Sequence, residues 1–220
     1  MKNTDTISQI ITLLATLMLV LQLLLVGQRM LATSIRLFAA QSFLLAAIAG
    51  IICLATSAWH VGVVAILTIA GKVVFLPWIL GRIVTRINIE QEIRPYLNMT
   101  ASMLICGALT VLAYVVARPM TTLDRLGSNT LAVAIALLLT GFFLMINRRK
   151  ALTQVLALLT MENGVMLAAI ALTTYGMPLM VEIGIFFDVV VAAMVLGILV
   201  FRIRETFTSM DVSKLNELKW

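Results

Sequence analysis

The sequence is 220 residues long; 62% of its residues are hydrophobic and only 12% are charged. Its mean hydropathy of +1.09 exceeds what a water-soluble domain of this size can bury in one core. The formal net charge is +6, but most basic residues lie in short segments between apolar runs, which is typical of membrane proteins and argues against a nucleic-acid partner. The composition predicts a polytopic membrane protein.

Seven apolar runs follow one another along the chain, each long enough to cross a bilayer. A hydrocarbon core of about 30 Å needs about 20 apolar residues in a helix. The predicted fold class is therefore all-α, with about seven transmembrane helices. They are expected at 8–26, 37–56, 61–80, 97–117, 129–146, 151–173 and 178–201.

The Lys and Arg residues divide unequally between the two sets of loops. One side receives Arg29, Arg36, Arg82, Arg86, Arg94, Arg148, Arg149, Lys150, Arg202, Arg204, Lys214 and Lys219, and the other receives Lys2, Arg118 and Arg125. Because short cytoplasmic loops are enriched in basic residues, the N-terminus is predicted outside and the C-terminus inside. The run RRK at 148–150 is expected to anchor helix ends against anionic lipid.

The chain contains signs of an internal repeat. The segment LAAIA occurs at 45–49 and again at 167–171, and each copy precedes a short turn and a span that ends in basic residues. Spans one to three would then correspond to spans five to seven in a parallel arrangement, with the fourth as a connector. The predicted division is a first repeat at 1–96, a connecting helix at 97–128 and a second repeat at 129–220.

Ionisable side chains occur inside the predicted spans, although each costs about 2.5 to 3.5 kcal/mol at the centre of a membrane helix. They are Lys72, Glu162, Glu182 and Asp188, and Gln41 adds a neutral amide to the second span. Glu162, with Asn163 beside it, is expected near the midplane, and Asp188 at a similar depth. Since desolvation disfavours charge, protonation of such carboxylates can come within reach of neutral pH.

All five residues are therefore candidates for a proton path, with Lys72 as a switching counter-charge. The alternative is that they tie helices together by hydrogen bonds or one ion pair. Glu182 and Gln41 fit that alternative at least as well as a functional role, because Glu182 faces away from Asp188 and neutral amides commonly bridge membrane helices.

No pattern in the sequence indicates a catalytic centre. A serine elbow, a glycine-rich phosphate loop, a CxxC pair and a haem-ligand histidine pair are all missing from the sequence. Cys53 and Cys106 lie in apolar runs without further thiol or imidazole at ligand spacing, and they are expected to be packing residues. No cofactor or metal is expected on this chain.

Four segments carry a resemblance to a known family: TMENG at 160–164, VEIGI at 181–185, the helix around Asp188, and MDVSKLNELK at 210–219. Over its whole length the chain resembles the hydrogenase-4 component E family, membrane-arm subunits of formate hydrogenlyase-type and related group 4 energy-converting hydrogenase complexes. Residues 129–220 are also similar to the K-type (4L) subunit of complex I and to the C subunit of multisubunit cation/proton antiporters.

In those relatives two helix-borne carboxylates lie on the hydrophilic axis of the membrane arm, and the match carries this role to Glu162 and Asp188. Two features depart from the K-type pattern: the second carboxylate is Asp rather than Glu, and the turn between the sixth and seventh spans is shorter.

The resemblance implies a non-catalytic membrane-arm subunit of a redox-driven, proton-translocating complex in a prokaryotic cytoplasmic (inner) membrane. The complex itself would be an oxidoreductase, of the hydrogenase or quinone-reductase kind. Expected partners are the lipid bilayer and other membrane-arm subunits of a hetero-oligomer, both antiporter-like and complex I-like. Two alternatives remain open: a subunit of a multisubunit cation/proton antiporter, and a purely structural scaffold between antiporter-like subunits. The transported ion is either a proton or sodium.

Overall fold

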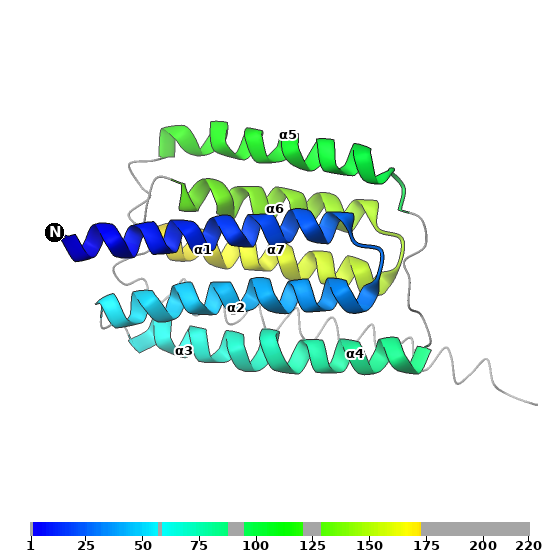
Figure 1. The fold of residues 1–220 in the computed structure, drawn as a ribbon, viewed down its shortest axis with the longest axis horizontal. Coiled ribbons are helices and arrows are strands. Elements are labelled where there is room, and N and C mark those ends of the chain that lie inside the picture. The colour runs from blue at the N-terminus through cyan, green and yellow to red at the C-terminus, as the bar shows by residue number, and fades with distance from the viewer. Residues whose placement is uncertain (1, 57–58, 88–94, 121–128, 173–220) are drawn as a thin grey trace, which may run out of the picture. The chain divides into compact units, whose positions relative to one another are not determined.

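The computed structural model describes residues 2–56, 59–87, 95–120 and 129–172. All elements within these ranges are helical (Figure 1). They are α1 (Lys2–Gly27), α2 (Leu31–Thr56), α3 (Trp59–Thr68), the π-helical segment η1 (Ile69–Phe75), α4 (Leu76–Ile87), α5 (Met99–Ala117), the short 3-10 turn η2 (Arg118–Met120), α6 (Thr130–Asn147) and α7 (Ala151–Leu172).

Six spans in this part of the chain are long and apolar enough to cross a membrane, so the predicted all-α membrane class is confirmed. They are Thr6–Gly27, Leu31–Ala55, Val61–Arg82, Met99–Met120, Thr130–Asn147 and Leu152–Leu172. The third runs without a break through α3, η1 and the start of α4. The predicted seventh span at 178–201, with Glu182 and Asp188, lies outside the described residues.

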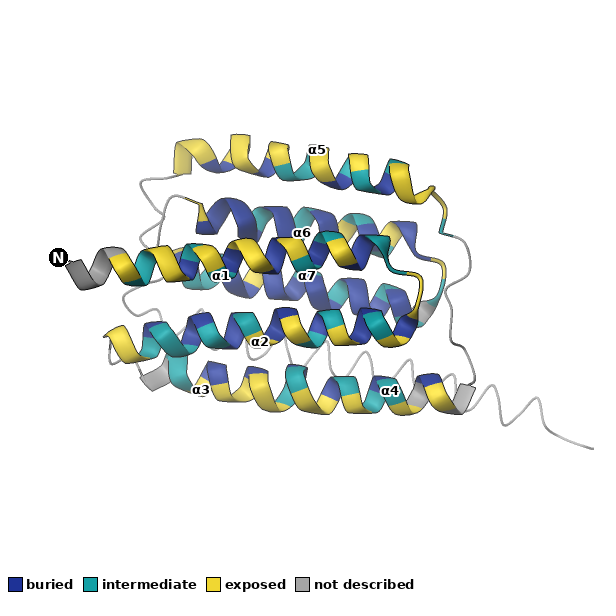
Figure 2. Cartoon of the chain, viewed as in Figure 1, coloured by how far each residue is buried: buried dark blue, intermediate teal, exposed yellow. Residues whose placement is uncertain are grey.

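The helices differ in how far they are buried by their neighbours (Figure 2). In α6 and in α7, 61% of the membrane-spanning window is buried, against 17% in α5. α5 contacts α6 and α1 through a narrow set of side chains, whose buried members are Ser102, Cys106, Ala113 and Ala117. Its outer face is apolar, as a surface in contact with lipid tails or another membrane helix requires.

The ends of α1 and α6 lie together. Arg148, directly after α6, donates from Nη2 to the carbonyls of Leu25 and Val26 in the last turn of α1. α1 and α6 therefore run in the same direction, and so do α2 and α7, which follow them. A parallel repeat requires this arrangement, but because residues 173–220 lie outside the described part, the repeat stays a prediction.

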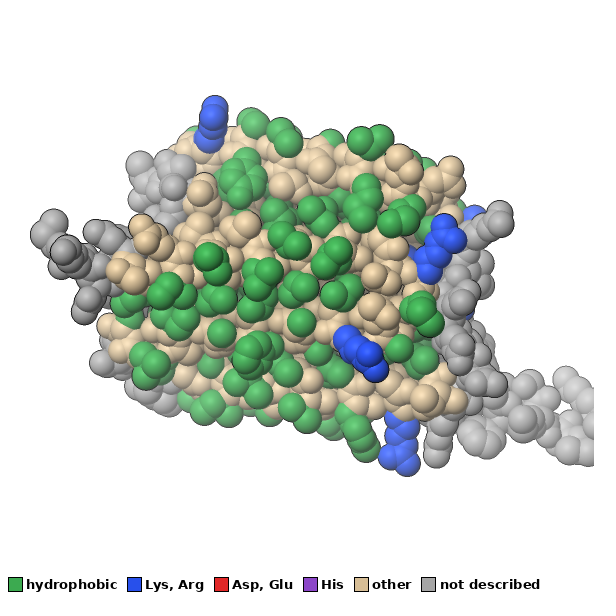
Figure 3. All heavy atoms as spheres, in the orientation of Figure 1, with side chains coloured by type: hydrophobic (Ala, Val, Ile, Leu, Met, Phe, Trp, Pro, Cys, Tyr) green, Lys and Arg blue, Asp and Glu red, His purple; other side chains and the backbone are tan. Residues whose placement is uncertain are grey.

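Basic residues gather at this end of the bundle. Tyr96 donates its backbone N–H to the Asn147 carbonyl at 3.1 Å, which brings the segment before α5 to the end of α6. On the face drawn in Figure 3, most Lys and Arg side chains lie toward the end opposite the N-terminus, and apolar side chains cover the middle. The side of the membrane on which this end lies remains a prediction.

Arg148 departs from the expectation for the RRK run. Its side chain is 5% exposed, and Nη2 also donates to the Gln28 carbonyl at 3.0 Å. The expected contact with lipid headgroups is therefore wrong for Arg148, because the carbonyls at the end of α1 have no partners within their own helix and accept from its guanidinium instead. Arg149 is exposed and lies over the Tyr96 ring, 4.2 Å from its centroid.

Candidate functional site

Lys72 and Glu162 form a buried ion pair between η1 and α7. Lys72 Nζ lies 3.4 Å from Glu162 Oε2, and the side chains are 5% and 1% exposed. Glu162 is eleven residues from the start of α7, or about 16 Å along a helix. In a hydrocarbon core of about 30 Å this depth is near the middle.

Close packing of α6 on α7 sets the direction in which Glu162 points. A Cβ added to Gly164 would lie 2.8 Å from the backbone N of Leu138, and one added to Gly141 would lie 2.9 Å from the Cα of Met161. The two backbones therefore approach without intervening side chains, as small residues allow in membrane helices. With the face of α7 that carries Met161 and Gly164 held against α6, Glu162 and Asn163 project toward η1 and α2.

Lys72 occupies the middle of the π-helical segment. The Leu76 N–H donates to the Gly71 carbonyl, one residue further back than in an α-helix. Pro77 follows directly; it has no N–H, and its ring crowds the carbonyl one turn earlier. A proline at this place disfavours a regular α-helix, and here the interruption takes the form of a π turn on its N-terminal side. Such turns are rare and occur frequently at functional sites.

Asn163 joins the ion pair to a network of neutral polar side chains. Its Oδ1 accepts from Lys72 Nζ at 3.4 Å, while its Nδ2 donates to Gln41 Oε1 at 3.2 Å and to Ser42 Oγ at 3.0 Å. Asn163, Gln41 and Ser42 are each at most 1% exposed. Gln41, predicted from sequence as a site residue, therefore reaches Lys72 through one intervening amide.

The network continues into α1 and returns to α7. Gln41 Nε2 donates to Gln22 Oε1 at 3.0 Å and to the Met18 carbonyl at 3.3 Å, and Gln22 Nε2 lies 3.5 Å from Thr160 Oγ1. Sequence reasoning missed Gln22, Ser42 and Thr160. Gln22 could have been found, since it is an amide within an otherwise apolar run at the centre of a span.

The remaining predicted site residues are not brought to this cluster by the described part of the structure. Glu182 and Asp188 lie outside it. In the described ranges, no group of three or more His, Cys, Asp and Glu side chains could hold a metal ion. Cys53 and Cys106 are free thiols within α2 and α5.

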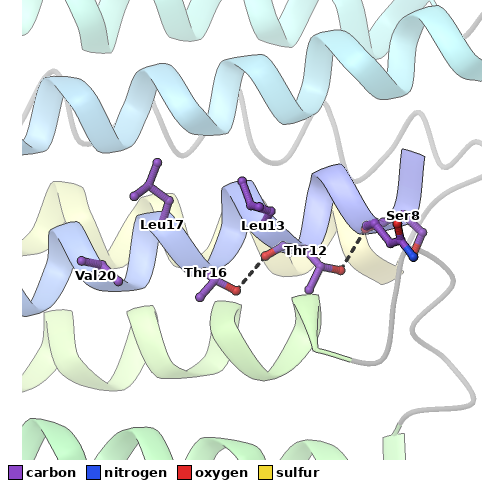
Figure 4. Close-up of a pocket in the computed structure, with 7 residues that line it drawn as sticks. Ser8, Thr12, Leu13, Thr16, Leu17 and Val20 are labelled. Atoms are coloured by element: carbon purple, nitrogen blue, oxygen red, sulfur yellow. Dashed lines mark hydrogen bonds between the residues drawn. The ribbon is translucent and has the colours of Figure 1, made fainter. Parts of the chain in front are cut away.

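A shallow groove on the exposed side of α1 is a separate feature (Figure 4). Its lining consists of Ser8, Gln9, Thr12, Leu13, Thr16, Leu17 and Val20. The Thr12 and Thr16 hydroxyls donate to carbonyls one turn earlier in α1, at 2.9 and 2.7 Å. The groove has no titratable lining residue, so the ion pair is the stronger candidate for chemistry.

The chemistry available at the ion pair is proton exchange. A carboxylate and an ammonium group can each change protonation state, whereas the surrounding amides and hydroxyls only donate and accept hydrogen bonds at neutral pH. Proton exchange between buried titratable groups is what an intramembrane relay requires.

Comparison with known proteins shows the family of the chain. Residues 129–220 match the family model described as NADH-ubiquinone/plastoquinone oxidoreductase chain 4L. The uncharacterized protein Rv0085 of Mycobacterium tuberculosis is 34% identical over 198 residues, which cover 89% of this chain and 90% of that protein. Hydrogenase-4 component E of Escherichia coli strain K12 is 30% identical over 215 residues, covering 96% and 98% of the two chains. No solved structure matches the chain. With such a relative matched over nearly its whole length, the chain belongs to the hydrogenase-4 component E family.

Proposed function

We propose that the chain is a non-catalytic membrane subunit of a redox-driven, proton-translocating complex, in which Glu162 and Lys72 are protonatable stations of the proton path. The observation that carries this proposal is the buried pair between Lys72 Nζ and Glu162 Oε2 at 3.4 Å. The relatives supply its setting, since one of them is by name a component of a hydrogenase and the second half matches an oxidoreductase chain.

A buried ion pair by itself adds little to the stability of a protein. Removing two charges from water costs several kcal/mol each, and well-packed apolar residues often serve as well or better. A sequence that keeps Lys72 and Glu162 at mid-membrane depth therefore favours a functional reason for them. When Glu162 takes up a proton, the net charge of the pair changes by one. In a medium of low dielectric constant this change strongly alters the electrostatic energy of neighbouring charges.

The remaining parts of the proposal rest on the sequence. Asp188 would be the second carboxylate of the path, Glu182 a further titratable group nearer the outer surface, and Gln41 a neutral polar side chain beside the path, next to Asn163. The N-terminus would face outward and the C-terminus inward across a prokaryotic inner membrane, with antiporter-like and complex I-like subunits as neighbours.

The test of the relay compares Glu162→Gln with Glu162→Asp in the assembled complex. Gln keeps the size of the side chain but cannot take up and release a proton, whereas Asp keeps a titratable group on a shorter arm. Proton-coupled turnover should be lost or strongly lowered by Gln and partly retained by Asp. Thr140→Val is the matched control, because Thr140 is also buried but bonds to its own helix at Ala136; it should leave turnover unchanged.

Assembly is measured alongside turnover and should persist in both Glu162 variants, since the Asn163 carbonyl still accepts from Lys72. Full coupled turnover in Glu162→Gln, with assembly verified, would refute the relay.

A scaffold function is the second candidate, because the pair and its amides also tie η1, α7, α2 and α1 together. The Glu162→Gln comparison separates the scaffold from the relay, whereas affinity purification of the intact complex followed by mass spectrometry identifies the kind of complex by its partners. Co-purifying hydrogenase or iron–sulfur subunits support the proposal. Antiporter subunits with no redox subunit would place the chain in a cation/proton antiporter instead.

A further inference from the structure

We propose that Asn163, Gln41 and Gln22 form a directed chain of carboxamides that positions the ammonium group of Lys72 beside Glu162. The proposal rests on the proposed function and adds separate roles. Glu162 and Lys72 are the protonatable stations, and the amides are positioning residues that hold Lys72 in place. Gln41 thereby receives a positioning role.

The direction of the chain begins at Lys72. An ammonium group can only donate hydrogen bonds, so Asn163 presents its Oδ1 to Lys72 Nζ, at 3.4 Å. Its Nδ2 then points away, and donates to the oxygen of Gln41 at 3.2 Å. Gln41 in turn has its Nε2 free to donate onward, to Gln22 Oε1 at 3.0 Å.

The far side of Gln41 requires the same direction independently. Gln41 Nε2 also lies 3.3 Å from the backbone carbonyl of Met18, which can only accept. Reversing the Gln41 amide would place its oxygen against both the Met18 carbonyl and Gln22 Oε1. Lys72 at one end and Met18 at the other therefore agree on one orientation for the amides.

The chain closes on the helix that carries Glu162. Gln22 Nε2 donates to Thr160 Oγ1 at 3.5 Å, and Thr160 Oγ1 donates to the Ala157 carbonyl at 2.8 Å. Hydrogen bonds thus run in one sense from η1 to α7, to α2, to α1 and back to α7. Each amide accepts with its oxygen from the preceding donor and donates with its nitrogen to the next acceptor. Gln22, Gln41, Asn163 and Thr160 are each at most 1% exposed, so water does not compete for these bonds.

Carboxamides neither take up nor release protons near neutral pH, so the three amides do not conduct protons. Its consequence is mechanical and electrostatic. Buried hydrogen bonds in series polarise one another, and a buried amide that loses its partner is strongly disfavoured. Displacing Lys72 from Asn163 would therefore weaken every hydrogen bond along the amides, and the free-energy cost of this opposes the displacement. When Glu162 is protonated and its attraction to Lys72 ends, the Asn163 carbonyl still holds the ammonium group at the pair.

A spectroscopic experiment tests the chain of amides without measuring turnover. The full-length chain is labelled with ¹⁵N at lysine Nζ in lipid bilayers, and the Lys72 signal is identified by its loss in Lys72→Arg. We expect the Lys72 signal to shift in Asn163→Leu and, less, in Gln22→Met, which keeps the length of the side chain two amides away. Thr140→Val should leave it in place. A Lys72 signal that does not move in Gln22→Met would overturn the proposal.

A turnover cycle shows whether Asn163 acts through Lys72. In the assembled complex, Asn163→Leu should lower proton-coupled turnover several-fold, but should cause no further loss when added to Lys72→Met. An equal fold-loss in both backgrounds would instead mark Asn163 as a packing residue and overturn the proposal. Should Glu162→Gln retain full coupling, the proposed function fails, while the lysine signal still decides the positioning role separately.

Discussion

Arg148 and Arg149 are adjacent in the sequence, yet their side chains have different surroundings. Arg148 is buried and donates from Nη2 to two carbonyls in the last turn of α1 and to the Gln28 carbonyl just after it, at 3.0 to 3.1 Å. Arg149 is exposed and contacts the face of the Tyr96 ring. Arg148 therefore joins α1 to the α6–α7 connection, and Arg149 has the surface position expected of a helix-anchoring charge.

Replacing Arg148 by Met should destabilise the protein, because the α1 carbonyls lose a charged donor in a buried site. Bonds of this kind contribute roughly 1.5–3 kcal/mol. Arg149→Met is the control and should cost at most about 1 kcal/mol, the value of an exposed cation–π contact. Unfolding by SDS in mixed micelles measures both. Equal free energies of unfolding for the two variants would show that the Arg148 hydrogen bonds stabilise the protein no more than the exposed Arg149 contact does.

The sequence identified Glu162, Lys72 and Gln41, because polar residues inside apolar spans are conspicuous. It predicted no pairing among them, because the helix faces that meet are decided by packing between segments far apart in the chain. The pairing of Lys72 with Glu162 came only from the structure. Arg148 was missed because a basic residue just after a span is expected at the headgroups.

Among the described helices, α6 and α7 pack most closely, and their contact determines where the site residues of α7 point. The close approach occurs at Gly141 and Gly164, where the opposing atoms belong to backbone. The helix bounds were largely predictable from apolar run length, with α7 at Ala151–Leu172 against the predicted 151–173. The π segment η1 was not, because its extra residue per turn has no periodic signature beyond the following Pro77.

Adding a methyl group at Gly141 should push α6 from α7. The new Cβ would lie 2.9 Å from Met161 backbone atoms, which cannot rotate away as a flexible side chain would. Gly141→Ala should therefore lower the free energy of unfolding by about 1–3 kcal/mol, as overpacking does. Gly107→Ala on α5 is the matched control, since no atom lies within 4 Å of the added Cβ; it should be neutral or slightly stabilising. Equal stability of the two variants would contradict the close approach.

At the scale of the whole molecule, most of the described basic residues lie at one end of the bundle. Arg29, Arg148, Arg149 and Lys150 lie between helices there, Arg36 is near the start of α2 and Arg82 is at the end of the third span, whereas Lys72 lies within η1 and Arg118 follows the opposite end of α5. The sorting predicted from the loops thus corresponds to a physical end of the bundle. By the positive-inside rule we expect this end to face the cytoplasm.

Reporter fusions test this orientation together with the seventh span. A reporter after Trp220 should behave as cytoplasmic, and one inserted near Gly127 as external. Alkaline phosphatase and green fluorescent protein give opposite signals on the two sides and serve as mutual controls. Two cytoplasmic signals would mean that the span count is wrong, and an exchanged pattern would reverse the orientation.

The proposed role of the Lys72–Glu162 pair is proton transfer, beyond holding helices together. Lys72→Met alone leaves a buried carboxyl group without its ammonium partner and should lower the free energy of unfolding, by up to about 3–5 kcal/mol. Adding Glu162→Gln removes the remaining titratable group of the pair and should restore much of that stability.

Proton-coupled turnover of the assembled complex, measured in Lys72→Met and in the double variant Lys72→Met/Glu162→Gln, therefore separates the two roles. The pair as a proton station predicts that the double variant regains stability and assembly while coupled turnover stays no higher than the low residual turnover of Lys72→Met. Recovery of coupled turnover together with stability in the double variant would contradict the claim and leave the pair as a structural link between η1 and α7.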